Sequence, residues 1–345
     1  MRIVVANNMA PFTHGGAEEL ATHLARRLSL QGHDVELVRI PFAWEPYLVL
    51  PKQMAIARQI KLDSADALIA LKFPAYVIPH QNKTVWLLHQ YRQAYDLYES
   101  GHTNLPADED GQYVRTAIRR ADNQAFTESR KIFTNSPVTG ERLAFWNSIA
   151  SEVLYPPLND PELFPGGDAE PYIFAGGRID DLKRQEMLVR AVARAPRKVR
   201  LVVAGPPDSP HTAARLQRLT HELGIEDRVT LDLRFLSRIE IARWVNGAAA
   251  CAYIPYDEDS LGYVVMEAAE ASKPVITTID SGGIRGLVRH DETGWVVPPE
   301  EEALGEAMGQ ALSSPSHTRS KGRQMRAHWL SFDADWSRTI ERLLA

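Results

Sequence analysis

The sequence predicts an α/β protein with two domains, each built around a parallel sheet. The chain has 345 residues and a hydrophobic content of 44%, which suffices for two domains of ordinary size. A short apolar run, a glycine-rich turn and an amphipathic helix follow one another over residues 2–30, and an apolar run, a polar turn and a helix recur over residues 248–271. Such units are typical of parallel sheets, in which a helix connects one strand to the next.

The first unit of this kind consists of a strand at residues 2–6 and a helix at residues 17–30. Gly15 and Gly16 stand before the helix, where glycines let a ligand approach the backbone closely. The amides at the start of the helix favour binding of a phosphate group. The turn lacks the spacing Gly-x-Gly-x-x-Gly, which argues against a dinucleotide such as NAD.

His89 follows directly after an expected strand at residues 84–88, which is preceded by another at residues 67–71. The carboxyl end of a parallel strand lies at the edge of the sheet where ligands bind, so His89 is a candidate binding residue. A single histidine is more often structural, and this alternative stays open here. Residues 113–131 are expected to form an arginine-bearing helix with a solvated face, or alternatively a surface for an anionic or lipid-linked acceptor.

The expected domain boundary is the polar stretch 159–170, which is rich in proline and glycine. The first domain then covers residues 1–158 and the second residues 159–332, followed by a terminal helix at residues 333–345. Further strands are expected at residues 132–136, 152–158, 200–205 and 228–231.

The second domain opens with a strand and a glycine pair that place Arg178 in a loop, and Lys183 follows at the start of the next helix. Arginine offers a planar fork of donors and lysine a point charge, so two such cations suit a diphosphate. Two isolated surface bases are the alternative interpretation.

A pair of carboxylates frames the later turn, with Asp259 just before it and Glu267 eight positions further, inside the helix. Two acids at this spacing can contact opposite ends of an extended polyhydroxylated ligand, and the amides between them can meet a phosphate. In the alternative interpretation Asp259 is only an N-cap and Glu267 a solvated helix position. The turn between the acids consists of Ser260, Leu261, Gly262 and Tyr263.

Together these motifs resemble the retaining glycosyltransferases of family 4, whose GT-B fold has two Rossmann-like domains facing across a cleft. The resemblance rests on the acid pair around a Gly-aromatic turn, on the spacing of Arg178 and Lys183 after a glycine, and on the double glycine followed by Gly-His-x-Val at residues 32–35. It covers nearly the whole chain.

Three positions depart from the family pattern. Asp259 is one methylene shorter than the usual glutamate, so the neighbouring Glu258 is an alternative for the acid that reaches the donor. Gly286 stands where the family often has a glutamate. Arg184 replaces the glycine that usually follows the lysine, which leaves the local backbone conformation open.

The resemblance implies transfer of a sugar from a UDP- or GDP-linked donor to a glycan, a lipid-linked or a small-molecule acceptor, with retention at the anomeric carbon. It further implies that the first domain binds the acceptor, that the second binds the donor, and that the terminal helix returns to the first domain. The alternatives are a nucleotide-sugar epimerase or phosphorylase of the same fold, and a sugar-nucleotide binding protein without activity.

The resemblance also implies roles for the candidate residues of the second domain. Arg178 and Lys183 would stabilise the leaving diphosphate, Glu267 would bind the ribose, and Asp259 would bind the donor sugar. The turn at residues 260–263 would offer its amides to the donor.

In the first domain, the resemblance implies that Gly15 and Gly16 lie beside the donor diphosphate. His89 would orient hydroxyl groups of the sugar or of the acceptor. No carboxylate stands out as a nucleophile, which favours front-face displacement.

The composition argues against several other classes of protein. The formal net charge of −5 gives no indication of nucleic-acid binding. Cys251 is the single cysteine, which leaves no disulfide and no cysteine metal site. No apolar run approaches the roughly 18 residues of a membrane span, so we expect a cytoplasmic protein, with a peripheral membrane contact as an open alternative.

Three Asp-x-Asp strings, at residues 108–110, 257–259 and 333–335, raise the question of a metal-dependent transferase. Such strings arise by chance in an acidic chain, and the GT-B resemblance implies that cationic side chains take the place of a metal. We therefore expect neither a metal nor another cofactor.

Overall fold

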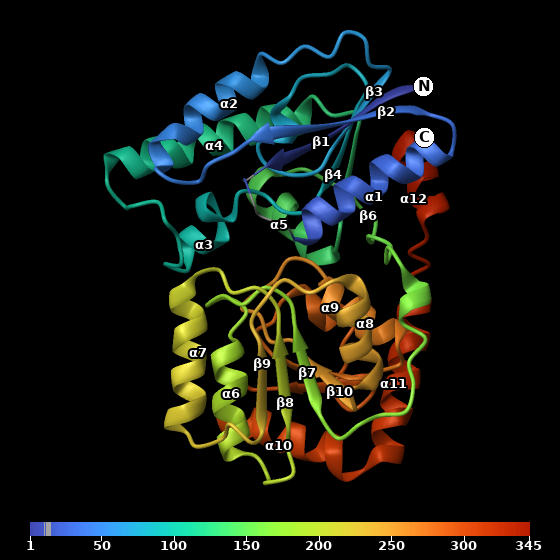
Figure 1. Ribbon diagram of the computed structural model, residues 1–345. Helices are drawn as coiled ribbons and strands as arrows, with labels where there is room; N and C mark the ends of the chain where they lie inside the picture. Colours follow the sequence, from blue (N-terminus) through green and yellow to red (C-terminus); the bar gives the residue numbers. More distant parts are fainter. Residues whose placement is uncertain (10, 12–14) are drawn as a thin grey trace. The chain divides into compact units, whose positions relative to one another are not determined.

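The computed structural model describes residues 1–9, 11 and 15–345 of the chain (Figure 1). Contacts between residues divide the chain into two compact units. The first unit comprises residues 1–159 and 334–345, and the second comprises residues 160–333. The expected divisions lie after residues 158 and 332.

In the part of the chain that the structure describes, the first unit contains a six-stranded sheet in the order β2-β1-β3-β4-β5-β6 (Figure 1). All neighbouring strands pair in parallel. The strands are β1 (Arg2–Met9), β2 (Asp34–Pro41), β3 (Ala67–Ala70), β4 (Lys83–Leu87), β5 (Lys131–Thr134) and β6 (Glu152–Val153).

Helices cover both faces of this sheet, which explains why the residues of its inner strand β3 are all apolar and buried. One buried cluster joins α2 and α4 to the sheet, and the other joins α1 and α12. Helix α12 thus connects the end of the chain to the first unit, and it packs against α1. The helices are α1 (Gly16–Leu30), α2 (Leu50–Arg58), α3 (Asp96–Glu99), α4 (Glu109–Thr127), α5 (Pro137–Asn147) and α12 (Trp336–Leu344).

The predicted helix at residues 113–131 is wrong at both ends. Helix α4 begins at Glu109 because Asp108, in extended conformation, accepts a hydrogen bond from the backbone amide of Gly111 and caps the helix. The Asp-x-Asp string at residues 108–110 is therefore a cap and a first turn, where negative charge suits the helix dipole. The helix ends at Thr127, and Lys131 already belongs to β5.

Within its described residues, the second unit also contains a six-stranded parallel sheet, in the order β12-β11-β10-β7-β8-β9. The strands are β7 (Ile173–Gly176), β8 (Leu201–Ala204), β9 (Val229–Asp232), β10 (Ala250–Ala252), β11 (Val275–Thr278) and β12 (Gly294–Val297). The helices are α6 (Gln185–Arg194), α7 (Pro210–Glu222), α8 (Arg238–Gly247), α9 (Tyr263–Glu270), α10 (Glu301–Ser313) and α11 (Pro315–Leu330).

The order of strands in the second sheet fixes the place where a ligand can bind. The chain adds β8 and β9 on one side of β7 and then returns to place β10 on the other side. In open α/β sheets, ligands bind outside the carboxyl ends of the strands at such a reversal. The loop after β7 carries the Gly-Arg motif and the loop after β10 carries the acidic motif, so the topology brings the two motifs together.

Three further features of the described residues concern membrane spans, metal ligands and the single cysteine. No helix among them is long and apolar enough to cross a membrane. Their side chains form no group of three or more histidines, cysteines, aspartates or glutamates that suits a metal ion. Cys251 is buried in β10, where burial raises the pKa of its thiol to about 12.

Asp122 is a carboxyl group buried completely inside the first unit, on α4. It accepts hydrogen bonds from the hydroxyl groups of Tyr76, at 3.0 Å, and Tyr95, at 2.8 Å. Burial raises its pKa to about 7, and the two hydrogen bonds offset only part of this rise. The folded protein thus keeps a proton on Asp122 at pH values where the unfolded chain has lost it.

We expect the contribution of Asp122 to stability to be fully present below about pH 4 and to be lost as the pH rises through 7. Between pH 5 and pH 8 the free energy of unfolding should fall by about 3 kcal/mol through this group. Urea unfolding of the wild type and of Asp122→Asn at both pH values measures the effect. The variant lacks the titrating group, so an identical pH dependence in both proteins would contradict the assignment.

Candidate active site

The loop after β7 positions the two candidate cations. Gly177 has a φ of +103°, which turns the chain sharply after the strand. Asp180 then accepts hydrogen bonds from Nε of Arg178, at 3.2 Å, and from the backbone amide of Lys183, at 3.0 Å. The side chain of Arg178 is 54% exposed and that of Lys183 only 18%. One aspartate therefore orders both ends of the motif.

Arg184 keeps the left-handed backbone conformation that a glycine would favour, with a φ of +55°. For a residue with a Cβ this conformation costs about 1–2 kcal/mol. Its guanidinium group donates hydrogen bonds to the backbone oxygens of Ile254 and Pro255, at 2.7 and 3.0 Å, and to the carboxylate of Asp280, at 2.8 and 2.9 Å. These charge-assisted bonds offset the strain and fasten the start of α6 to the loops after β10 and β11.

Backbone hydrogen bonds connect the acidic loop after β10 to the turn after β11. The backbone amide of Asp257 donates a hydrogen bond to the backbone oxygen of Asp280 at 2.8 Å. The backbone amide of Gly283 donates one to the backbone oxygen of Glu258 at 2.7 Å. Gly282 and Glu258 form an isolated parallel bridge. These bonds fix the backbone of the loop, and the side chain of Asp259 is buried, with 3% of the residue exposed.

Lys183 and Glu258 form an ion pair between the two loops. The ammonium group of Lys183 also lies 5.3 Å from the centre of the Tyr253 ring. Burial lowers the pKa of Lys183, but the charge of Glu258, the contribution of Tyr253 and the hydrogen bonds to both together raise it by more, and the net effect is a raised pKa. Lys183 is thus a cation at neutral pH. The sequence pattern does not predict that Glu258 pairs with Lys183.

Glu267 lies in α9 and is as deeply buried as Asp259, with 3% of the residue exposed. Arg238, at the start of α8, forms an ion pair with this carboxylate. Nε and Nη2 of Arg238 also donate to Asp160, at 2.9 and 2.7 Å. Burial lowers the pKa of Arg238, while the bonds to Asp160 and Glu267 raise it by more. Glu267 is therefore no solvated helix position.

The turn between the acids places Gly262 at the N-cap of α9 with a φ of +74°. A Cβ at this position would lie 2.8 Å from Cε1 of Tyr253, so the turn requires glycine. Ser260 accepts a hydrogen bond from the amide of Gly262 at 3.3 Å, and Leu261 is fully buried. Tyr263 begins the helix.

The first unit carries the other three candidate residues. Gly15 caps α1 in extended conformation and Gly16 is the first residue of that helix, and both are exposed. Residues 10 and 12–14, which precede them in the sequence, lie outside the described residues. His89 is half-buried, and its Nδ1 lies 2.6 Å from the backbone oxygen of Gln90. Because a carbonyl oxygen only accepts, Nδ1 carries a proton.

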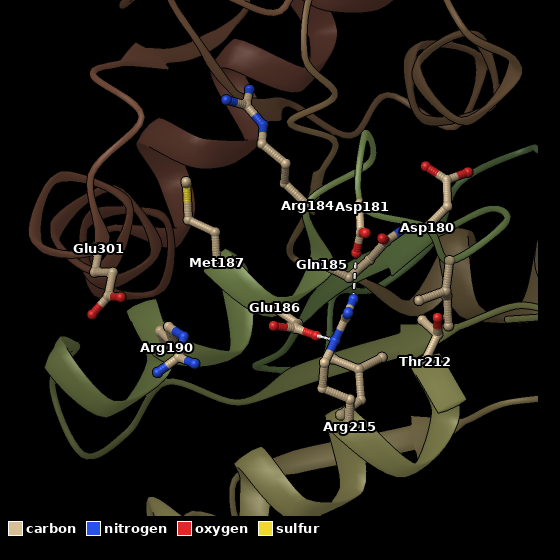
Figure 2. Close-up of a pocket in the computed structure, with 12 residues that line it drawn as sticks. Asp180, Asp181, Arg184, Gln185, Glu186, Met187, Arg190, Thr212, Arg215 and Glu301 are labelled. Atoms are coloured by element: carbon tan, nitrogen blue, oxygen red, sulfur yellow. Dashed lines mark hydrogen bonds and ion pairs between the residues drawn. The ribbon is translucent and has the colours of Figure 1, made fainter. Parts of the chain in front are cut away.

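A pocket of about 320 Å³ lies beside the start of α6 (Figure 2). Arg215, one of the three arginines that line it, lies between Asp181 and Glu186 and forms ion pairs with both. These two carboxylates already neutralise Arg215, and the acidic loop after β10 contributes no residue to the lining. We therefore place the candidate site at the ends of β7 and β10, and the pocket shares with that region only Asp180 and Arg184 among the residues discussed above.

Sequence comparison finds a known family profile that matches the second unit. The family profile described as "Glycosyl transferases group 1" matches residues 164–328. The D-inositol 3-phosphate glycosyltransferase of Xylanimonas cellulosilytica is 34% identical over 145 residues, which are 41% of this chain. The matched region spans 34% of the length of that relative.

Two solved structures resemble the chain over 99% of its length. Sucrose-phosphate synthase of Thermosynechococcus elongatus has a TM-score of 0.77 at 20% identity and is covered over 97% of its chain. HepE of Anabaena, solved in complex with UDP and glucose, has a TM-score of 0.72 at 19% identity and is covered over 98%. At these identities the likeness establishes the fold, which is GT-B, as the sequence predicts.

The profile match includes the Gly-Arg loop after β7, the acidic loop after β10 and the residues that hold both loops in place. Its region coincides with nearly all of the second unit. The second unit therefore matches the glycosyl transferases group 1 profile over nearly its whole length.

Proposed function

We propose that the chain is a retaining glycosyltransferase that moves a sugar from a UDP- or GDP-sugar to a hydroxyl group of a glycan, a lipid-linked molecule or a small molecule. One observation carries the proposal: the second unit places a cationic loop and an acidic loop together at the reversal of its strand order. The profile match of the second unit and the UDP and glucose bound to HepE support a nucleotide-sugar donor.

In this proposal the second unit binds the donor. Arg178 and Lys183 stabilise the negative charge that grows on the leaving diphosphate, a type of contact worth a few kcal/mol for each donor group. Glu267 accepts hydrogen bonds from the ribose hydroxyls and Asp259 from the donor sugar. The turn at residues 260–263 presents its amides to the donor.

The first unit binds the acceptor in this proposal. Gly15 and Gly16 lie beside the diphosphate, where a side chain would obstruct its approach. His89 donates its Nδ1 proton to the backbone oxygen of Gln90, which orients the ring, and in this proposal the ring contacts a hydroxyl group of the sugar or the acceptor.

We propose front-face displacement as the mechanism. The acceptor oxygen forms its bond to the anomeric carbon on the face from which the diphosphate departs, and this preserves the configuration. The acceptor proton passes to the leaving phosphate oxygen. Arg178 and Lys183 supply the positive charge that stabilises this oxygen as its bond to carbon breaks.

A thermal-shift panel of UDP-, GDP- and ADP-sugars tests the donor class, because only a ligand that binds the native state raises the melting temperature. Transfer to a panel of acceptors, with the anomeric configuration of the product read by NMR, tests the reaction. Release of the sugar without any acceptor product would indicate an epimerase, and dependence on inorganic phosphate a phosphorylase. Absence of any shift and of any product would refute the proposal.

The two acids of the pair should respond differently to neutralisation. Asp259→Asn should weaken binding of the intact sugar donor about tenfold relative to the free nucleoside diphosphate, because it removes a charged acceptor from the sugar end alone. Glu267→Gln should weaken both ligands by the same factor, because both contain ribose. Calorimetric titration of each variant with UDP-glucose or GDP-mannose and with UDP or GDP measures the ratio, and an equal ratio in both variants would contradict the assignment.

A further inference from the structure

We propose that Glu258 competes with the donor diphosphate for Lys183. Its carboxylate holds the ammonium group that the proposed function assigns to the diphosphate, so a donor that enters must take Lys183 from Glu258, and the departing product is released as Glu258 takes Lys183 back. The inference rests on the proposed function for the identity of the ligand. It concerns a residue outside the Asp259 and Glu267 pair.

The ion pair is shielded from water on most sides. The side chain of Lys183 is 18% exposed and that of Glu258 is 23% exposed. Tyr253 covers the ammonium group from one side. Water and salt therefore screen this pair less than a pair at the open surface, and a change in its charge acts strongly on a neighbouring anion.

The backbone of Glu258 is fixed, while its side chain can change rotamer. The backbone amide of Gly283 donates a hydrogen bond to the backbone oxygen of Glu258 at 2.7 Å, and Gly282 forms an isolated parallel bridge with Glu258. The backbone of Glu258 thus stays beside Lys183. The exposed fraction of the side chain gives it a path toward solvent, so that rotation of one side chain opens the pair.

The charges of Lys183 and Glu258 cancel, which weakens the attraction of the site for a diphosphate. An ammonium group has three donors, but one of them is directed at Glu258. A bound diphosphate would lie near the carboxylate of Glu258, and this like-charge approach costs binding energy. Glu258 therefore weakens the binding of the free diphosphate as well as of the donor, which favours release of the product.

The test is calorimetric titration of wild type and Glu258→Gln with UDP, GDP and inorganic pyrophosphate. We expect Glu258→Gln to bind the nucleoside diphosphate that the wild type accepts about tenfold more tightly, with pyrophosphate changed in the same direction. In a Lys183→Met background, Glu258→Gln should bring a much smaller gain, because the competition for Lys183 is gone. Glu302→Gln, which removes an exposed carboxylate paired with Arg194 at 3.5 Å, controls for the loss of one negative charge and should change nothing.

The possible outcomes separate this inference from the proposed function. Nucleotide binding that is equal or weaker in Glu258→Gln, or a full gain in the Lys183→Met background, would overturn the competition while leaving the function intact. Loss of affinity for the sugar donor alone, in a parallel titration of the same proteins with UDP-glucose or GDP-mannose, would make Glu258 the sugar-binding acid instead. If no nucleotide binds but pyrophosphate binds more tightly to Glu258→Gln, the competition stands and the proposed function fails. If no variant binds any of the probes, both are refuted.

Discussion

Replacing Lys183 by alanine is expected to lower the rate of sugar transfer by about 100- to 1,000-fold, because the ammonium group acts on charge that grows in the transition state. Arg178→Ala should show a similar loss. Steady-state rates with saturating donor measure the effect. Lys198→Ala, which removes an exposed lysine before β8, at the opposite edge of the same sheet, serves as the control and should turn over normally.

The fold of Lys183→Ala should remain intact although the variant leaves Glu258 without its cation. The carboxylate is partly exposed and can rotate toward water, so the penalty of an isolated buried charge does not arise in full. We expect a fall in melting temperature of a few degrees, which Glu258→Gln in the same chain should largely restore. Near-normal turnover in both Lys183→Ala and Arg178→Ala would refute the diphosphate assignment.

Much of the architecture is predictable from local sequence patterns. A parallel strand, a glycine or polar turn and a helix form a continuous segment, so the units at residues 172–183 and 248–271 are recognisable without tertiary information. The strand order then follows from few possibilities, since short connections favour neighbouring strands. The same reasoning places Arg178 and Asp259 at the ligand edge of the second sheet.

The partners of the candidate residues are not predictable in this way. Arg238 joins Glu267, which is 29 positions away, to Asp160, which is 78 positions away. No spacing rule connects residues at such separations in the sequence, because the packing of helices brings them together. Local geometry plays no part in it. The ion pair of Glu258 with Lys183 has the same origin. Sequence patterns therefore identify the charged groups of the site, but not which of them neutralise one another.

Gly282→Ala, in the turn after β11, should reduce the rate of sugar transfer about 100-fold and lower the melting temperature by several degrees. Gly282 has a φ of +68°, and a Cβ there would lie 2.3 Å from the backbone oxygen of Glu258 and 2.7 Å from its amide nitrogen. Backbone strain of this kind costs about 1–3 kcal/mol. The clash is with backbone atoms, so the loop that carries Glu258 and Asp259 must move.

Gly224→Ala is the matched control, because Gly224 also has a positive φ, +61°, but a Cβ there would meet no atom within 4 Å. It should lower the melting temperature modestly and leave the rate of transfer unchanged. The difference between the two variants then isolates the displacement of the acidic loop from strain in the backbone alone. Equal rates in Gly282→Ala and Gly224→Ala would show that the position of this loop does not limit transfer. A small movement matters because a polar group displaced by about 1 Å loses most of its advantage in the transition state.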